Sequence, residues 1–400
     1  MNFNLILLSI PLYFILIGLE LLIDKIYQRQ NYRFNDAITN ISCGMGEQVT
    51  AVFFKLIVVT LYELLYERYA LFHIPINWIT FIALFISVDF FYYWFHRYSH
   101  VINLFWGGHV VHHQSEEYNL SVALRQGWFQ KFFSFFFYLP LAFIGFSPVQ
   151  FLAVSSLVTL YQFWLHTRAI GKLGPFELLF NTPSHHRVHH GINPKYIDKN
   201  HAGMLIVWDK MFGTFQEEEE EPTYGITHPI NTWDPLEANL NHWKRMYTGI
   251  KQMRGTGDKL RYMFNPPGWR PAYIPADEGG FDPLTYKKYD TTVPASMNLY
   301  VLFQYAVTLT AATFFLFNTG AMGMADKLVA VCLVIIAIVN YSNLFESKKY
   351  GVAIEIGRIF LSVAALLFWY HFTTPMLNGA YLAWIIISCI WLFLMRKPAA

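Results

Sequence analysis

Charged residues are scarce in this chain. Only 14% of its 400 residues are charged, with 29 Lys and Arg against 27 Asp and Glu, whereas an average soluble domain has about 25%. This composition excludes an ordinary soluble surface, and the 54% of hydrophobic residues exclude intrinsic disorder. The formal net charge of +2 is too small to suggest a nucleic-acid partner, and we expect none.

Cysteine is also scarce. Cys43, Cys332 and Cys389 stand far apart, which excludes a disulfide framework, a cysteine zinc site and a CxxC redox pair. The sequence has no haem-binding motif and no glycine-rich dinucleotide fingerprint either. If the chain carries out redox chemistry, its electrons must therefore come from a separate donor.

Long apolar runs are abundant. A helix needs about 20 mostly apolar residues to cross the hydrocarbon core, so the sequence predicts an all-α fold, a polytopic integral membrane helical bundle. The first run has neither a basic start nor a small-residue cleavage site, so we expect a retained helix and not a signal peptide. The expected spans are residues 4–23, 48–66, 77–95, 298–317, 327–345, 351–371 and 379–395.

A further apolar stretch, 132–165, is interrupted by Pro140 and by segment 145–148. Each half is short for a full crossing, so we expect a tilted helical hairpin or a re-entrant pair. The segments 24–47, 96–131, 166–297 and 346–350 then share one side of the membrane with the C-terminus. That side carries most basic residues outside the spans, and the opposite side carries little more than Arg68. The positive-inside rule makes the first side cytoplasmic.

Histidine is the residue in excess, because ten of the 15 histidines lie between positions 96 and 190. Positions i, i+3 and i+4 share one helical face, so each group aims its imidazoles at one point. Isolated histidines are usually structural, but that interpretation does not explain eight in three helically spaced groups on one membrane side. The groups are His96 and His100, then His109, His112 and His113, then His186, His189 and His190.

Together with His166, which ends the apolar stretch, nine imidazoles are candidate metal ligands. A zinc site takes four ligands and a six-coordinate iron at most six, so this number predicts two metal ions. Imidazole suits zinc, copper, iron and nickel alike, so the ligand type alone does not identify the metal. No Glu-x-x-His pair of the ferritin kind occurs among the groups.

Other polar residues are candidates for supporting the metal ligands or contacting a substrate. Asp89 and Asp209 could orient ligands, or could be capping or exposed side chains. His185 points about 100° away from His186 on a helix, so we expect a supporting role. His201 is also a supporting candidate. Asn119, Arg125 and Gln126 could bind a headgroup or cap a helix.

The chain divides into three expected parts. Residues 1–76 form N-terminal membrane helices, and 77–297 form the catalytic domain with a cytoplasmic, histidine-rich di-metal cap. The Pro- and Gly-rich segment 264–282 leads to a C-terminal four-helix membrane bundle, 298–400. This bundle has one histidine, His371, so we expect no metal chemistry there.

The ordered histidine pattern on a membrane chain resembles the fatty acid hydroxylase (sterol desaturase) superfamily. The segments HRYSHVINLFWGGHVVHHQSEEYNLSVALRQ, YQFWLHT, LGPFELLFNTPSHHRVHHGIN, IDKNHAGMLIVWDKMFGTF and YGITHPIN are similar to its branch that cleaves glyceryl ethers. The resemblance implies a membrane di-iron oxygenase in which the nine histidines bind two iron ions, although zinc fits the same ligands in a purified sample.

The same resemblance implies a lipid substrate and dioxygen as co-substrate. That branch hydroxylates the carbon beside the ether oxygen, and the product collapses to an aldehyde and glycerol. Its electron donor is tetrahydropterin, but the branch has a glutamate where this chain has Val101, so the donor stays open. Another lipid hydroxylase or a desaturase of the same superfamily is the alternative.

Two other classes also remain as alternatives. A metal-binding transporter would place its site near the bilayer midplane, whereas these histidines lie at span ends and in loops. A hydrolytic zinc enzyme would need an open metal position with a carboxylate base nearby. Glu116 and Glu117 follow His113 closely and are candidates for that base.

Overall fold

The computed structural model describes residues 5–275, 286–368 and 375–395. Within these ranges the chain is helical, and its strand pairing is limited to two isolated bridges, Phe180 with Leu205 and Gly191 with Tyr224. The all-α prediction is therefore confirmed. The helices are α1 (Leu5–Tyr27), α2 (Phe34–Tyr69), α3 (Trp78–Val101), α4 (Asn103–His113), α5 (Gln130–Ile144), α6 (Pro148–Phe163), α7 (Pro183–His190), α8 (Val207–Phe212), α9 (Pro235–Gln252), α10 (Thr256–Phe264), α11 (Ala295–Asn318), α12 (Met324–Phe345), α13 (Gly351–Phe368) and α14 (Pro375–Met395).

Three described helices are long and apolar enough to cross a membrane: α3, α11 with the short turn after it, and α12. A fourth candidate is α2, which bends by 43° between Phe34–Lys55 and Ile57–Tyr69. The expected spans 4–23, 351–371 and 379–395 correspond to α1, α13 and α14, although the described helices do not meet the same criterion. His371 lies outside the described residues.

The stretch 132–165 forms two short apolar helices, α5 and α6, with a tight connection. Gly145 ends α5 in the left-handed region, with φ of 119°. Ser147 then starts α6 with a capping box, in which its hydroxyl accepts from the Gln150 backbone and the Gln150 side chain accepts from the Ser147 backbone. Two short helices joined by a turn are therefore present, as both the expected hairpin and the expected re-entrant pair require. We call this unit the hairpin.

The connection between α5 and α6 lies beside the connection between α2 and α3. Leu71 N donates to Phe143 O at 2.7 Å, and Ile74 N donates to Gly145 O at 3.1 Å. The turn of the hairpin therefore lies level with the C-terminus of α2 and the N-terminus of α3. The histidines lie at the other ends of these helices, around the C-terminus of α3 and the residues after α6.

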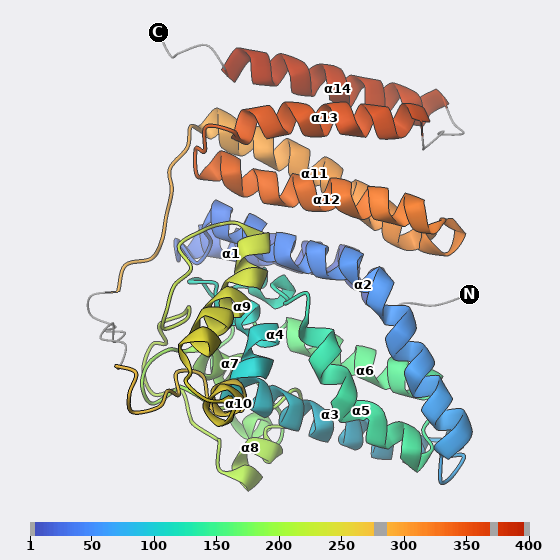
Figure 1. The fold of residues 1–400 in the computed structure, drawn as a ribbon, viewed down its shortest axis with the longest axis vertical. Coiled ribbons are helices and arrows are strands. Elements are labelled where there is room, and N and C mark those ends of the chain that lie inside the picture. Colours follow the sequence, from blue (N-terminus) through green and yellow to red (C-terminus); the bar gives the residue numbers. More distant parts are fainter. Residues whose placement is uncertain (1–4, 276–285, 369–374, 396–400) are drawn as a thin grey trace.

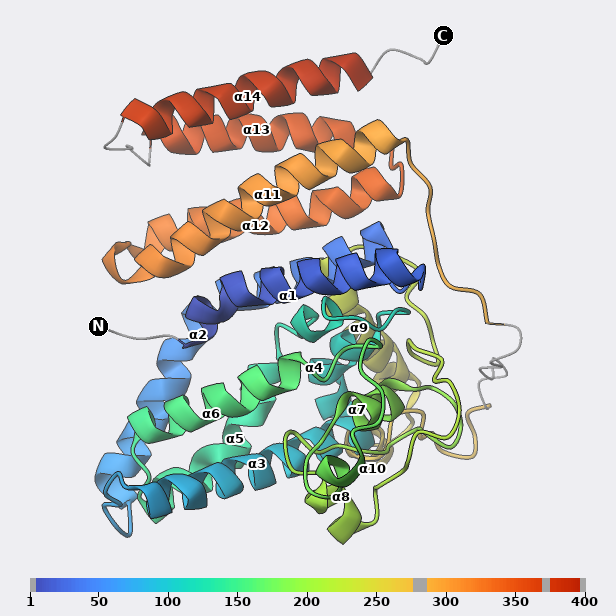
Figure 2. The same ribbon diagram turned by 180° about the vertical axis from the view of Figure 1, so that it is seen from behind.

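The long helices run roughly alongside one another, and α7 to α10 gather at one of their ends (Figures 1 and 2). Contacts between distant segments fix this arrangement. Arg29 donates to Arg168 O, Arg33 to Tyr289 O, and Trp233 N to the Glu346 carboxylate. The segments that the charge pattern places on one side of the membrane therefore do meet at one end of the molecule.

A close backbone approach joins α2 to the segment that supports α4. A Cβ on Gly44 would lie 2.1 Å from Leu124 O, so only glycine fits there without a backbone shift. The adjoining Arg125 donates through Nε to Val111 O at 2.7 Å and through Nη1 to Asn40 Oδ1 at 3.0 Å. These contacts hold α2, α4 and the connection after α4 together.

The helices α11 to α14 enclose a buried polar network. Glu355 is fully buried and pairs with Arg358, whose Nη2 lies 2.5 Å from Oε1. Tyr300 donates to Glu355 at 2.8 Å, and Gln304 accepts from Arg358 at 2.8 Å. A buried ion pair is tolerated only when its remaining hydrogen bonds are satisfied, and these neighbours satisfy them.

Candidate metal centre

The nine predicted histidines come together in two clusters, and all are buried. Within each cluster, one nitrogen from every ring lies within 4.8 Å of the others. The first cluster draws its rings from α3, α4 and α7, and the second from α4, α7 and the residues after α6. The first cluster is His96, His100, His109, His113 and His189; the second is His112, His166, His186 and His190.

Helical geometry explains how consecutive residues serve different clusters. His112 and His113 are consecutive on α4, and His189 and His190 are consecutive on α7. Neighbouring side chains on a helix diverge by about 100°, so one member of each pair faces each cluster. Two short helices therefore place two candidate metal-binding clusters side by side.

Five of the rings are oriented by a hydrogen bond from Nδ1 to an oxygen. Such a bond fixes the ring and leaves Nε2 free to act as a ligand. Four acceptors are backbone carbonyls, and one is a side-chain amide. The bonds are His96 to His201 O (2.7 Å), His109 to Gln130 Oε1 (2.9 Å), His112 to Arg125 O (2.9 Å), His166 to Gln162 O (2.9 Å) and His189 to Lys199 O (2.9 Å).

These bonds indicate which nitrogen carries the proton. A carbonyl oxygen only accepts, so Nδ1 of His112 and of His166 must be the protonated nitrogen, and each neutral ring has a lone pair on Nε2. Those two Nε2 atoms face each other at 3.1 Å. The same holds for His96 and His109, whose Nε2 atoms lie 2.9 Å apart. Lone pairs at this distance repel unless a cation lies against both nitrogens.

Burial keeps the rings neutral. Removal from water lowers the pKa of His109 and of His166 to about 4. Burial, followed by the neighbouring imidazoles, lowers the pKa of His113 and of His190 well below the usual value. A metal ligand must be neutral imidazole, so the clusters hold their ligands in the required form.

Unpartnered nitrogens complete the fit to metal ions. His100 Nε2, His189 Nε2 and His190 Nε2 are buried and have no hydrogen-bond partner. Buried polar atoms are normally satisfied, so three such nitrogens in one place indicate a missing partner. The facing Nε2 atoms are also about 3 Å apart, the separation expected for two nitrogens bound at right angles to one metal at about 2.1 Å. The residues present therefore fit two metal ions.

The two aspartates predicted to support the ligands hold the backbone of the 201–208 segment. Asp209 accepts from His201 N and Ala202 N, both at 2.8 Å. His201 O in turn accepts from His96 Nδ1. Asp209 therefore supports a ring of the first cluster indirectly, by holding the backbone of His201. Asp89 accepts from Met204 N at 2.8 Å and from Leu205 N and the Trp208 indole, so it anchors residues 204–208 of the same segment.

Most of the other candidates for a supporting role form hydrogen bonds that organise turns and join helices. Asn119 donates to Asn31 O and accepts from Ser121, so it organises a turn. Gln126 donates to Ala123 O. Arg125 makes the contacts with α2 and α4 given above, and its carbonyl orients His112. His185 is buried beside Phe215 and belongs to neither cluster.

A third group of candidate ligands lies at the edge of the first cluster. His100, Asp198 and His201 bring one ligand atom each within 4.8 Å of the others. Asp198 did not stand out in the sequence, because a single exposed aspartate in a polar loop carries no spacing signal. The loop brings it to the cluster through residues in the left-handed region, with φ of 57° at Asp198 and 55° at Asn200.

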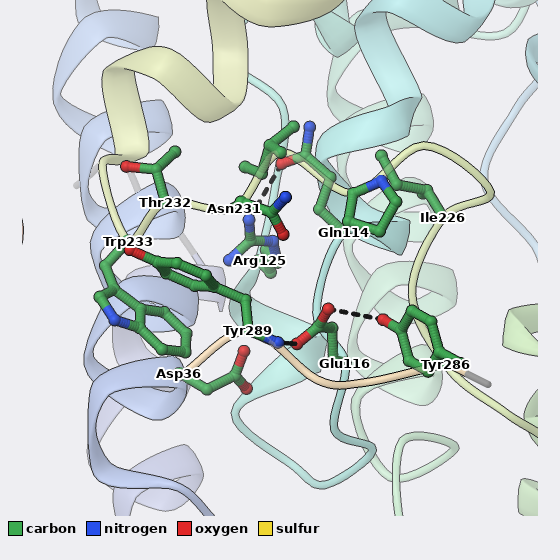
Figure 3. Close-up of a pocket in the computed structure, with 12 residues that line it drawn as sticks. Asp36, Gln114, Glu116, Arg125, Ile226, Asn231, Thr232, Trp233, Tyr286 and Tyr289 are labelled. Atoms are coloured by element: carbon green, nitrogen blue, oxygen red, sulfur yellow. Dashed lines mark hydrogen bonds between the residues drawn. The ribbon is translucent and has the colours of Figure 1, made fainter. Parts of the chain in front are cut away.

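A polar pocket lies beside the end of α4 (Figure 3). Glu116 accepts from Tyr286 Oη at 2.5 Å and from Tyr289 N at 2.7 Å, as the dashed lines in Figure 3 mark. Arg33 pairs with Glu116 at 3.2 Å and with Glu117 at 2.7 Å. Both carboxylates are thus engaged in ion pairs, and neither belongs to a candidate metal group among the described residues.

The fatty acid hydroxylase family matches residues 81–214, which include the nine clustered histidines. Alkylglycerol monooxygenase of Homo sapiens is 39% identical over 360 residues, covering 87% of this chain and 79% of the relative. The chain belongs to the alkylglycerol monooxygenase family. Alkylglycerol monooxygenase of Xenopus tropicalis is 44% identical over 264 residues, 65% of this chain and 58% of the relative.

A more distant relative is the ornithine lipid hydroxylase OlsE of Rhizobium tropici, which is 27% identical over 124 residues, 31% of this chain and 38% of that protein. No solved structure matches this chain. Membership of the alkylglycerol monooxygenase family confirms the predicted class, a membrane lipid hydroxylase that is an oxygen-using oxidoreductase.

Proposed function

We propose that this chain is a di-iron monooxygenase that hydroxylates the C–H bond beside the oxygen of a glyceryl ether. The observation that carries the metal part is the convergence of nine buried imidazoles in two clusters with lone pairs facing each other. The names of the relatives support the ether substrate. The apolar helices around the site suit a lipid that arrives from a bilayer.

The first cluster would hold one ion with up to five imidazoles, and the second cluster would hold the other with four. Bound iron would supply the electrons that activate dioxygen. In the overall reaction one oxygen atom enters the C–H bond, and the other leaves as water with two electrons and two protons from a donor. The resulting hemiacetal then separates into a fatty aldehyde and glycerol.

The chain's own residues have two roles in this chemistry. The oxygen acceptors behind the Nδ1 atoms hold five rings in one orientation, so the ligands are set before any metal binds. Burial excludes water, since none of the nine rings is more than 8% exposed. A site closed to water protects a reactive oxidant from side reactions.

We place the clusters on the cytoplasmic side, because the segments around them carry most of the basic residues outside the spans. The catalytic domain in this proposal is 77–297, between N-terminal helices 1–76 and a C-terminal bundle 298–400. A separate donor supplies the electrons. Tetrahydropterin is the first donor to test, and Val101 is the reason to test a ferredoxin system beside it.

The principal alternative keeps the metal centre and changes the lipid or the outcome. The similarity to OlsE, which is named an ornithine lipid hydroxylase, favours testing other lipids as substrates. The same assay on those lipids would also detect a desaturated product. A transporter is less favoured, because the clusters lie around the C-terminus of α3 and the residues after α6, at one end of the long helices. A zinc hydrolase is less favoured because Arg33 forms ion pairs with Glu116 and Glu117. These two carboxylates are therefore not free to act as the general base that a hydrolase needs.

The test uses the full chain, purified in detergent and loaded anaerobically with iron(II). A 1-O-alkylglycerol is supplied with dioxygen and either donor, and oxygen uptake and fatty aldehyde are measured together. We expect equal amounts of oxygen consumed and aldehyde formed, lost in His112→Ala. The matched control His73→Ala removes an exposed histidine at the opposite ends of the long helices and should keep the activity.

Three other results would contradict the proposal. A hydroxylated or desaturated lipid of another class, with no aldehyde from the ether, would favour the alternative within the superfamily. Turnover without oxygen would favour a hydrolase. Activity that survives in His112→Ala would mean that the reaction does not need the second cluster.

A further inference from the structure

His201 is a tenth buried imidazole, at the edge of the first cluster. Its ring centre lies 5.1 Å from that of His100, 5.9 Å from that of His96 and 5.7 Å from that of His189. The side chain is 1% exposed, and neither ring nitrogen has a hydrogen-bond partner. Its nearest carboxylate, Asp209, lies 3.8 Å from Nδ1, beyond hydrogen-bond distance, and already accepts from the backbone of His201.

A buried imidazole with two unsatisfied nitrogens is costly, because each nitrogen has lost its hydration without gaining a partner. Such a ring therefore indicates a ligand that satisfies it. The nitrogen atoms of the first cluster are too far from His201 for it to be a sixth member of that group. His201 instead groups with His100 and Asp198.

Asp198 supplies the third donor of this group and faces solvent. Its side chain is 46% exposed, and Oδ1 lies 3.7 Å from His100 Nδ1. This distance is too long for a hydrogen bond, so His100 differs from the five rings whose Nδ1 is held by an oxygen at 2.7 to 2.9 Å. A neutral imidazole has one lone pair, so His100 offers it either to the first cluster or to Asp198 and His201, and in the second case the first cluster keeps four imidazoles.

We propose that His100, Asp198 and His201 form an accessory position for a divalent transition-metal ion, through which the first cluster is loaded from solvent. Two imidazoles and one carboxylate are a donor set that iron(II) and zinc accept. Exposure falls from the carboxylate to the two rings, from 46% at Asp198 to 7% at His100 and 1% at His201. The ion binds here more weakly than in the clusters, because only three protein ligands hold it.

The test is a cobalt(II) titration of the metal-free full chain in detergent, with absorbance and metal content as readouts. Wild type should bind two ions tightly and a third more weakly. Asp198→Asn and His201→Phe should each lose only the third ion and fill the first cluster about 10-fold more slowly. Glu219→Gln is the control, since it alters an exposed carboxylate that pairs with Lys195.

Several outcomes would overturn this inference. They are a wild type that binds only two ions, a third ion that persists in both variants, and an unchanged rate of uptake. Loss of a tight ion in His201→Phe would make His201 a member of the first cluster instead. Asp198→Asn keeps the test decisive if His201→Phe fails to fold, because it changes an exposed side chain with little change in shape. The inference depends on the clusters binding metal and not on the lipid reaction, so a negative oxygen-uptake assay would not overturn it.

Discussion

His112 Nε2 and His166 Nε2 face each other at 3.1 Å, while the Nδ1 of each ring donates to a backbone carbonyl. Both protons are therefore directed away from the gap between the rings. Without an ion, this geometry brings two lone pairs together inside a buried site. The hydrogen bonds of these two rings therefore favour a cation between the two Nε2 atoms.

Metal removal should consequently destabilise the chain. A ligand that binds only the folded state stabilises it by about 2.7 kcal/mol at 100 times its dissociation constant. We expect a lower unfolding temperature after chelation, restored by adding iron(II) or zinc. Thermal unfolding in detergent, with and without chelator, measures this. An unchanged midpoint would mean that the clusters do not bind metal in the purified protein.

A pair of glutamines tests how the rings are held. Gln130 orients His109 through its side chain, whereas Gln162 orients His166 through its backbone carbonyl. Gln130→Ala should weaken metal binding at the first cluster about 10- to 100-fold, because such supporting bonds have effects of this size. Gln162→Ala keeps its carbonyl and should bind metal normally. Competition with a chelator measures both affinities, and equal losses in the two variants would contradict this account.

Asp209→Asn should affect the first cluster more than the second. The carboxylate accepts from His201 N and Ala202 N, and His201 O orients His96. An amide offers one acceptor where two are used, so we expect a loss of affinity of about 10- to 100-fold for one ion only. Cobalt titration would resolve the two sites. Equal weakening of both ions would mean a general distortion, and Glu219→Gln serves as the control.

The buried pair in the C-terminal helices should behave as a coupled unit. Arg358→Leu leaves Glu355 charged and uncompensated, which costs roughly 3–5 kcal/mol. Replacing both residues by leucine removes the unpaired charge, so the double variant should be more stable than Arg358→Leu alone. Unfolding of the two single variants and the double variant completes the cycle. Additive effects would show that the pair is not coupled.

The sequence predicted much of the site because helical spacing is local. The groups at 96–100, 109–113 and 186–190 all lie on helices, and their rings converge as expected. The hairpin at 132–165 was predictable from its prolines and glycine. These features depend on neighbours within a few residues, which the sequence displays directly.

Features that depend on contacts between distant segments could not be predicted. The sequence left Asn119, Arg125 and Gln126 between headgroup binding and capping. The structure shows that Asn119 and Arg125 bond to the distant residues Asn31 and Asn40, whereas Gln126 bonds locally to Ala123 O. Asp198 reaches His100 through a loop with left-handed residues. The pairing of each ring with its cluster also depends on how α4 meets α7.

His112 and His113 are consecutive but belong to different clusters, and so are His189 and His190. Consecutive Cα atoms are about 3.8 Å apart, a distance fixed by covalent bonds. Insertions or deletions between the two pairs change loop length without altering either spacing. One residue inserted within a pair would instead turn one ring about 100° around its helix. Length variation is therefore tolerable between these helices and excluded within them, because the covalent chain keeps the two clusters next to each other.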